Sequence, residues 1–151
     1  MDKRYDLIVF DWNGTLSQGL DVMGSSAPLC DGASRLLATL KQQGYWLAVA
    51  SNMATEQLRT EITAHNIQHY FMVIYGIERG FAKPHPYMLE QILAETGVDA
   101  DRTLMVGDTA NDMAFAHHAG VDGVWLTDLS TDLEGYAQYC VPNLQAALSI
   151  V

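Results

Sequence analysis

Short apolar runs alternate along this chain with longer stretches in which apolar residues recur at helical spacing. An apolar run of four or five residues is typical of a buried parallel strand, whereas leucines three and four positions apart are typical of a helix. The alternation predicts an α/β fold, with a doubly wound, Rossmann-like parallel sheet in three α/β/α layers. The expected strands are residues 6–10, 46–50, 72–75, 103–106 and 123–126, with an edge strand near 139–141.

The stretches between these strands predict helices. Leu36, Leu37 and Leu40 share one face of a helix that ends near Gly44, because glycine commonly follows the last helical residue. One segment, residues 17–30, fits neither pattern and predicts a loop over the carboxyl end of the first strand. The expected helices are residues 33–43, 55–65, 86–97, 111–119 and 143–150.

Length and composition indicate one folded domain over residues 1–151. Hydrophobic residues make up 49% and charged residues 17%, which excludes a disordered acidic chain. The apolar runs are far shorter than the ~18 residues of a membrane span, and the first residues do not resemble a signal peptide. Cys30 and Cys140 lie far apart and outside any zinc-binding pattern, so we expect two free thiols and a cytoplasmic protein.

The formal net charge of −10 narrows the class of partner. Nucleic acids and anionic membranes are bound through clusters of lysine and arginine, so we expect neither of them as a partner. A small phosphate ester stays compatible with the charge. Salt screens charges that lie more than about 8 Å apart, so a few groups near a pocket can decide what it binds.

Polar residues follow several predicted strands at the point where each strand ends. Residues 11–16 (Asp-Trp-Asn-Gly-Thr-Leu) follow the first strand, Ser51 and Asn52 follow the second, and residues 107–112 (Gly-Asp-Thr-Ala-Asn-Asp) follow the fourth. Lys83 precedes the third helix. The carboxyl ends of parallel strands share one edge of a sheet, where ligands of such folds bind. We therefore expect three carboxylates, a hydroxyl and an ammonium group to converge there.

This set of groups is suited to phosphoryl transfer. Three carboxylates at one edge repel by about 4 kcal/mol per close pair at an effective dielectric constant near 20, so a Mg²⁺ ion among them would be stabilising. Lys83 and the backbone N–H groups around Thr15 and Asn52 would hold an anion beside the ion. A carboxylate next to a bound phosphoryl group can attack it, which predicts an aspartyl-phosphate on Asp11.

Four motifs in this order resemble those of the haloacid dehalogenase superfamily of phosphohydrolases, in its phosphoglycolate-phosphatase-like branch. They are residues 11–16, Ser51-Asn52, Lys83-Pro84 and residues 107–112, and the resemblance spans nearly the whole chain. It implies a Mg²⁺-dependent phosphomonoester hydrolase. The resemblance implies that Asp11 is the nucleophile. It implies a metal site formed by Asp11, the Asn13 carbonyl and Asp108, with Asp112 in support. It also implies that Ser51 and Lys83 bind the phosphate, to which the residues themselves add Thr15 and Asn52.

Two features depart from the family pattern. Its phosphatases carry a second aspartate where this chain has Asn13, and that aspartate protonates the leaving alcohol and later activates water. An amide can accept or donate a hydrogen bond but cannot transfer a proton at neutral pH, so the expected turnover is slow. The intervals from Leu16 to Leu47 and from Ser51 to Lys83 are also too short for a cap domain.

Three other classes of protein are alternatives to a Mg²⁺-dependent phosphatase. A phosphorylated receiver domain is disfavoured, because no acidic residue follows the predicted third strand until Glu78. A capless zinc-dependent phosphatase lacks its Cys/His cluster. The remaining alternative is a catalytically impaired relative that binds a phosphorylated ligand or a protein partner, which Asn13 supports. For the preferred phosphatase we expect a small phosphorylated substrate or a phosphorylated macromolecule, with a second copy of the chain as a candidate cover for the open site.

Overall fold

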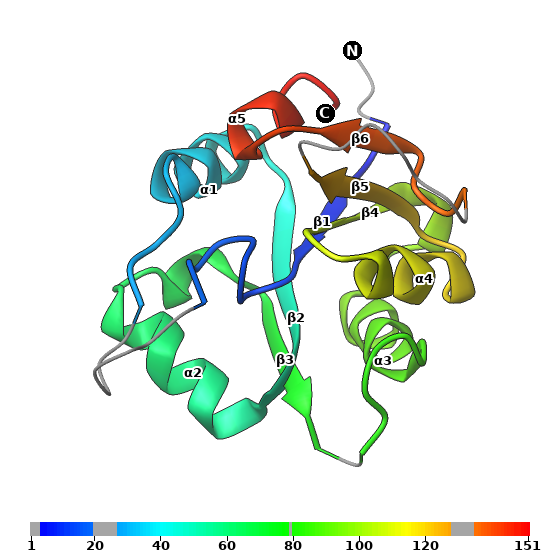
Figure 1. Cartoon of the computed structure of the whole chain (residues 1–151), viewed down its shortest axis with the longest axis horizontal. Helices are drawn as coiled ribbons and strands as arrows, with labels where there is room; N and C mark the ends of the chain where they lie inside the picture. Colours follow the sequence, from blue (N-terminus) through cyan, green and yellow to red (C-terminus); the bar gives the residue numbers. More distant parts are fainter. Residues whose placement is uncertain (1–3, 20–26, 79, 128–134) are drawn as a thin grey trace.

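Six parallel strands form one sheet in the computed structural model, which describes residues 4–19, 27–78, 80–127 and 135–151 (Figure 1). The order across the sheet is β3-β2-β1-β4-β5-β6, and every neighbouring pair is parallel. This arrangement confirms the predicted fold class. The strands are β1 (Leu7–Phe10), β2 (Trp46–Ala54), β3 (Val73–Ile77), β4 (Thr103–Gly107), β5 (Asp122–Leu126) and β6 (Tyr139–Val141).

Helices cover both faces of this sheet, because successive strand residues point to opposite sides. In β1, Ile8 and Phe10 belong to one buried apolar cluster, whereas Leu7 and Val9 belong to a second cluster on the other face. The first cluster is closed by α1 (Ala33–Gln42), α2 (Thr55–Ala64) and α5 (Leu144–Ala147), and the second by α3 (Tyr87–Thr96) and α4 (Ala110–His118). The three-layer, doubly wound arrangement is therefore as predicted.

The direction in which the chain crosses the sheet changes at β1. From β1 the chain moves outward through β2 and β3, and it then returns to place β4 on the other side of β1. Phe10 is paired with Val106, so the residues after β1 and β4 leave the sheet side by side. Ligands bind at such a switch point in open α/β sheets, and the fold places Asp11 and Asp108 there.

The second strand is longer than predicted. It runs to Ala54 and pairs with β3 through a register shift between Ala50 and Ala54, so that Ser51 and Asn52 lie within the irregular part. Gly76 makes this approach possible, since a Cβ atom there would lie 2.6 Å from the Thr55 nitrogen. Elsewhere α5 ends at residue 147 instead of 150, and two short 3₁₀ helices, Gln68–Tyr70 and Ala100–Arg102, were not predicted.

The loop after β1 is described in part, since residues 20–26 of the predicted 17–30 segment lie outside the described residues. Its two ends are joined by backbone hydrogen bonds of 2.8 Å from Gln18 to Pro28 and 2.7 Å from Cys30 to Leu16. The described parts of the two intervals noted above contain α1 in the first, and α2, a 3₁₀ helix and β3 in the second, with no cap domain. Within the described residues, no helix is long and apolar enough to cross a membrane.

Candidate active site

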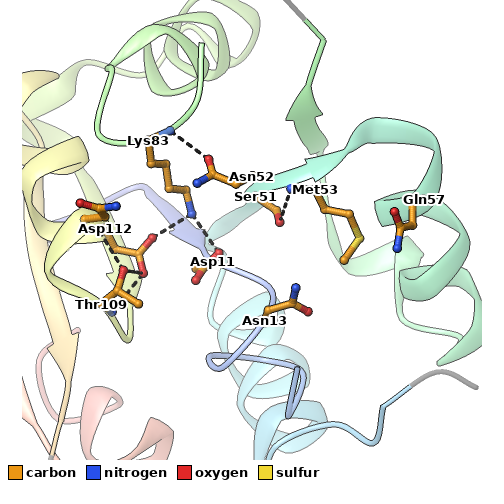
Figure 2. Close-up of a pocket in the computed structure, with 10 residues that line it drawn as sticks. Asp11, Asn13, Ser51, Asn52, Met53, Gln57, Lys83, Thr109 and Asp112 are labelled. Atoms are coloured by element: carbon orange, nitrogen blue, oxygen red, sulfur yellow. Dashed lines mark hydrogen bonds and ion pairs between the residues drawn. The ribbon is translucent and has the colours of Figure 1, made fainter. Parts of the chain in front are cut away.

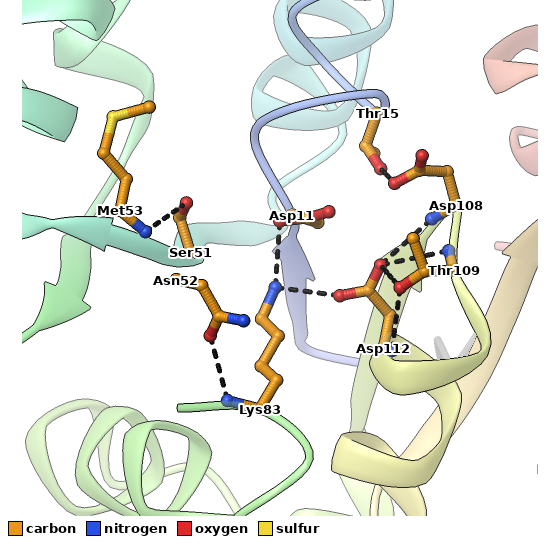
Figure 3. A network of polar contacts seen from close by, with 9 residues as sticks. All are labelled: Asp11, Thr15, Ser51, Asn52, Met53, Lys83, Asp108, Thr109 and Asp112. Carbon is orange, nitrogen blue, oxygen red and sulfur yellow. Dashed lines mark hydrogen bonds and ion pairs between the residues drawn. The ribbon is translucent and has the colours of Figure 1, made fainter. Parts of the chain in front are cut away.

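Asp11 lies at the carboxyl end of β1, where its side chain is 12% exposed. Its backbone nitrogen donates a hydrogen bond of 3.0 Å to the Val106 carbonyl, which fixes the chain as it leaves the sheet. Its Oδ1 atom accepts a 2.9 Å hydrogen bond from the Lys83 ammonium group (Figure 3). A backbone hydrogen bond from Trp12 also reaches this carboxylate, whereas Oδ2 has no side-chain partner among the described residues.

Lys83 is a buried ammonium group held between two carboxylates. Its Nζ atom lies 2.9 Å from Asp11 Oδ1 and 2.8 Å from Asp112 Oδ1. Its backbone nitrogen donates a 2.9 Å hydrogen bond to Asn52 Oδ1, which joins the loop before α3 to β2. Burial disfavours the ammonium form, but the two carboxylates outweigh that effect and raise the pKa of Lys83.

Asp112 connects Lys83 to the first turn of α4. Its Oδ2 atom accepts hydrogen bonds from the backbone nitrogens of Asp108 and Thr109, both 3.2 Å, and from the Thr109 hydroxyl, 2.9 Å. Thr109 in turn accepts from the Asp112 nitrogen, which completes a capping box at the helix start. Both carboxylate oxygens of Asp112 thus have protein partners. Gly107 leaves the room for them, because a Cβ atom there would overlap the Asp112 side chain.

Asp108 joins the loop after β4 to the loop after β1. Its Oδ1 atom accepts a 3.1 Å hydrogen bond from the hydroxyl of Thr15, and its backbone carbonyl accepts one of 3.1 Å from the Trp125 indole. Gly14 lies against the same carboxylate with a positive φ of 82°, and a Cβ atom there would overlap it. The buried Thr15, expected beside the phosphate, therefore uses its hydroxyl to orient a carboxylate.

The three carboxylates of Asp11, Asp108 and Asp112 form one cluster, in which one oxygen from each lies within 4.8 Å of the others. Lys83 supplies one positive charge against three negative ones. Burial raises the pKa of Asp11 to about 7, and repulsion from Asp112 adds to this effect while Lys83 opposes it. A divalent cation would offset the excess negative charge, and an all-oxygen donor set fits Mg²⁺.

A pocket of about 480 Å³ opens over this cluster (Figure 2). At its floor, Ser51 Oγ accepts a 3.1 Å hydrogen bond from the Met53 nitrogen, which leaves the hydroxyl proton for a ligand. The side-chain oxygen of Asn52, Oδ1, accepts a hydrogen bond from the Lys83 backbone nitrogen. The side-chain amide nitrogen of Asn52 therefore remains as a donor for a ligand. The residues that line the pocket are Asp11, Asn13, Ser51, Asn52, Met53, Gln57, Lys83, Thr109, Asn111 and Asp112.

The structure thus brings the predicted residues to one edge of the sheet but divides them between two positions. Asp11, Asn13, Ser51, Asn52, Lys83 and Asp112 line the pocket, whereas Thr15 and Asp108 lie beside it. Sequence reasoning assigned no site role to four lining residues, namely Met53, Gln57, Thr109 and Asn111. Met53 follows the Ser51-Asn52 motif within β2 and would have been found if the second strand had been extended, whereas Gln57 lies in α2. Thr109 and Asn111 lie within the 107–112 motif, which is the signal that could have found them.

Residues 8–126 match the family of haloacid dehalogenase-like hydrolases. The chain belongs to this family. Over 92 residues it is 40% identical to a phosphoglycolate phosphatase of Pasteurella multocida, an alignment that covers 60% of this chain and 41% of that protein. A phosphoglycolate phosphatase of Colwellia psychrerythraea is 31% identical over 125 residues, which is 80% of this chain and 55% of that one. The chain thus spans about half or less of the length of these haloacid dehalogenase-like relatives.

Solved structures of the haloacid dehalogenase-like family share the fold. A predicted phosphoglycolate phosphatase from Haemophilus somnus superimposes with a TM-score of 0.75 at 29% identity, over 84% of this chain and 59% of the other. A hydrolase of the same superfamily from Ehrlichia chaffeensis gives a TM-score of 0.83 at 21% identity, over 99% and 97% of the two chains. The second likeness concerns the fold alone, and it extends over nearly the full length of both proteins.

Proposed function

We propose that this protein is a Mg²⁺-dependent phosphomonoester hydrolase that acts through an aspartyl-phosphate on Asp11. The observation that carries the proposal is the Asp11 carboxylate at the floor of the pocket, with one oxygen held by Lys83 and the other without a side-chain partner among the described residues. A fixed carboxylate beside a buried ammonium group is a suitable nucleophile for a bound phosphate. The phosphoglycolate phosphatases similar to this chain support the same reaction class.

The residues that would hold Mg²⁺ are Asp11, Asp108 and the backbone carbonyl of Asn13. The cluster fits such an ion because its oxygen donors are close together and its negative charge exceeds that of Lys83. When bound, the ion would neutralise phosphate charge and orient the phosphoryl group. Asp112 belongs to the same cluster, but its two carboxylate oxygens already accept hydrogen bonds from Lys83 and from the start of α4. We therefore propose that Asp112 positions the Lys83 ammonium group and the first turn of α4.

In the first step, Asp11 Oδ2 forms a bond to phosphorus while the bond from phosphorus to the alcohol oxygen breaks. The Lys83 ammonium group, the Ser51 hydroxyl and the Asn52 amide nitrogen are placed to bind phosphoryl oxygens. These donors lie in fixed positions before the substrate arrives, so they stabilise the transition state without reorganisation. The departing alkoxide requires a proton unless its own basicity is low.

Asn13 makes both proton-transfer events slow. Its side chain is exposed at the mouth of the pocket, where a carboxyl group would protonate the alcohol and then activate water against the aspartyl-phosphate. The amide can bind water or the leaving group, but it cannot accept the proton. We therefore propose measurable turnover with good leaving groups and poor turnover with alkyl esters.

The same observation supports a second function, namely a binding protein for a phosphorylated ligand. Lys83, Ser51 and Asn52 would still bind phosphate in a protein whose Asn13 prevents turnover. In that protein the Asp11 carboxylate would serve to hold Lys83 and the cation. The two functions differ in one property, which is whether the bond to the leaving group breaks.

The substitution Asn13→Asp separates these functions. General acid–base help contributes about 10²–10⁴ in rate, so we expect the variant to hydrolyse p-nitrophenyl phosphate at least tenfold faster than the wild type. The gain should be larger for ethyl phosphate, because its leaving group needs the proton. Asn111→Asp is the matched control, since it adds the same charge to the same pocket. Absence of hydrolysis by both the wild type and Asn13→Asp would favour the binding function.

A further inference from the structure

One side of the pocket has no charged side chain. Asn13, Met53 and Gln57, which we call the neutral wall, lie away from Lys83 and Asp112 in the view of Figure 2. A phosphate bound at Asp11 and Lys83 would direct its ester group toward the rest of the pocket, of which this wall is a part. In that orientation the leaving group would contact the neutral wall.

The pocket has no cation to spare for a second anionic group. Among the described residues that line it, Lys83 is the single positively charged side chain, and its ammonium group is bound to Asp11 and Asp112. At the neutral wall, a carboxylate on the leaving group would lose water without gaining a positively charged side chain as a partner, which is unfavourable.

The neutral wall instead offers amide groups. The Gln57 amide nitrogen donates a 3.4 Å hydrogen bond to Glu61, whose other oxygen accepts a 3.0 Å hydrogen bond from the buried Trp12 indole. This contact directs the side-chain nitrogen of Gln57 along α2 toward Glu61. The side-chain oxygen of Gln57 then remains as an acceptor for a ligand. The Asn13 amide adds both a donor and an acceptor. Amide groups of this kind can form hydrogen bonds with hydroxyl groups of a ligand, and the Met53 side chain can pack against its carbon atoms.

We propose that the neutral wall selects an uncharged, hydroxyl-bearing leaving group, so that the ligand is the phosphate ester of a small polyol and not of a hydroxy acid. The proposal rests on the proposed function for the orientation of the phosphate. It separates this chain from the substrate named for its relatives, because glycolate carries a carboxylate.

Two esters of equal length test this selection: 2-hydroxyethyl phosphate and 2-phosphoglycolate, which differ in a CH₂OH group against a carboxylate. Calorimetry with the Asp11→Asn variant in saturating Mg²⁺ measures binding without turnover. The variant lacks one negative charge, so any bias it introduces favours the carboxylate. We expect 2-hydroxyethyl phosphate to bind at least about tenfold more tightly. Equal affinities, tighter binding of 2-phosphoglycolate, or binding of neither ester would overturn the selection.

The substitution Gln57→Arg, made in the same background, supplies the missing cation. It should reduce or reverse the preference by raising the affinity for 2-phosphoglycolate, whereas Gln68→Arg, outside the pocket, should leave it unchanged. An unchanged preference in Gln57→Arg would remove this residue from the wall's function and contradict the proposal. Hydrolysis of p-nitrophenyl phosphate by the wild type is measured separately. Its absence would count against the proposed function while the binding preference still stands.

Discussion

The two sides of the pocket are built differently. Asp11, Lys83 and Asp112, which we call the ion-pair side, are almost fully buried and joined by hydrogen bonds of 2.8 and 2.9 Å. On the neutral wall, by contrast, Asn13 and Gln57 are exposed. The ion-pair side is preorganised for one charged group, the phosphate. In our proposal the neutral wall contacts the leaving group, which is the part that varies between substrates. The wall also includes Asn13, the residue that we propose to limit turnover.

The substitution Asp11→Asn tests the ion-pair side with the largest expected effect. The amide is a poor nucleophile, so hydrolysis of p-nitrophenyl phosphate should fall by about 10³-fold or more. The folded state should persist, since Lys83 keeps Asp112 as a partner. Asp101→Asn, on an exposed 3₁₀ turn, is the control and should retain wild-type activity. Retained hydrolysis in Asp11→Asn would assign the nucleophile elsewhere.

Removal of the ammonium group should cost stability as well as activity. Lys83→Met leaves the carboxylates of Asp11 and Asp112 buried without their cation, which typically costs about 3–5 kcal/mol of unfolding free energy. Urea denaturation measures this loss, with Lys41→Met on the exposed face of α1 as the control. A loss of stability equal to that of the control would contradict the burial of an ion-pair network at this site.

Magnesium should stabilise the folded protein through the acidic cluster. A cation at a hundred times its dissociation constant contributes about 2.7 kcal/mol, which raises the melting temperature. Asp108→Asn should abolish that rise, whereas Asp99→Asn, outside the cluster, should retain it. No change in the wild-type melting temperature at millimolar Mg²⁺ would contradict the proposed metal site.

The smallest expected effect concerns the turn beneath Asp108. Gly14→Ala and Gly97→Ala both place a side chain at positive φ, so both should lose roughly 1 kcal/mol of stability from backbone strain. The added Cβ atom overlaps the Asp108 carboxylate at Gly14 and meets nothing within 4 Å at Gly97. The Mg²⁺-dependent rise in melting temperature should therefore weaken in Gly14→Ala alone. Equal rises in the two variants would place the ion away from Asp108.

Local patterns in the sequence predicted the strands and the edge at which the polar residues meet, because buried parallel strands leave continuous apolar runs. They did not predict the extension of β2, since Ser51 and Asn52 interrupt its apolar run and the register shift depends on Gly76 in another strand. The hydrogen bond between Thr15 and Asp108 joins residues distant in sequence and has no local signal.

Asp112 shows a different limit. Its spacing from Thr109 is that of a helix capping box, a signal present in the sequence. Its acidity suggested support of a metal ion. In the structure, one of its oxygens accepts a hydrogen bond from Lys83 and the other accepts hydrogen bonds at the start of α4. One carboxylate can serve a helix terminus and an active site together, so a motif that explains a residue in one way does not exclude a second role.

Rapid acid quenching followed by peptide mass spectrometry tests the central claim most directly, namely that Asp11 carries the phosphoryl group and Asn13 delays its release. With p-nitrophenyl phosphate and Mg²⁺, the wild type should accumulate phosphate on Asp11 because water is not activated against the aspartyl-phosphate. Asn13→Asp should turn over faster while showing a lower phosphorylated fraction. Hydrolysis without phosphate on Asp11, or phosphate on another residue, would contradict the account.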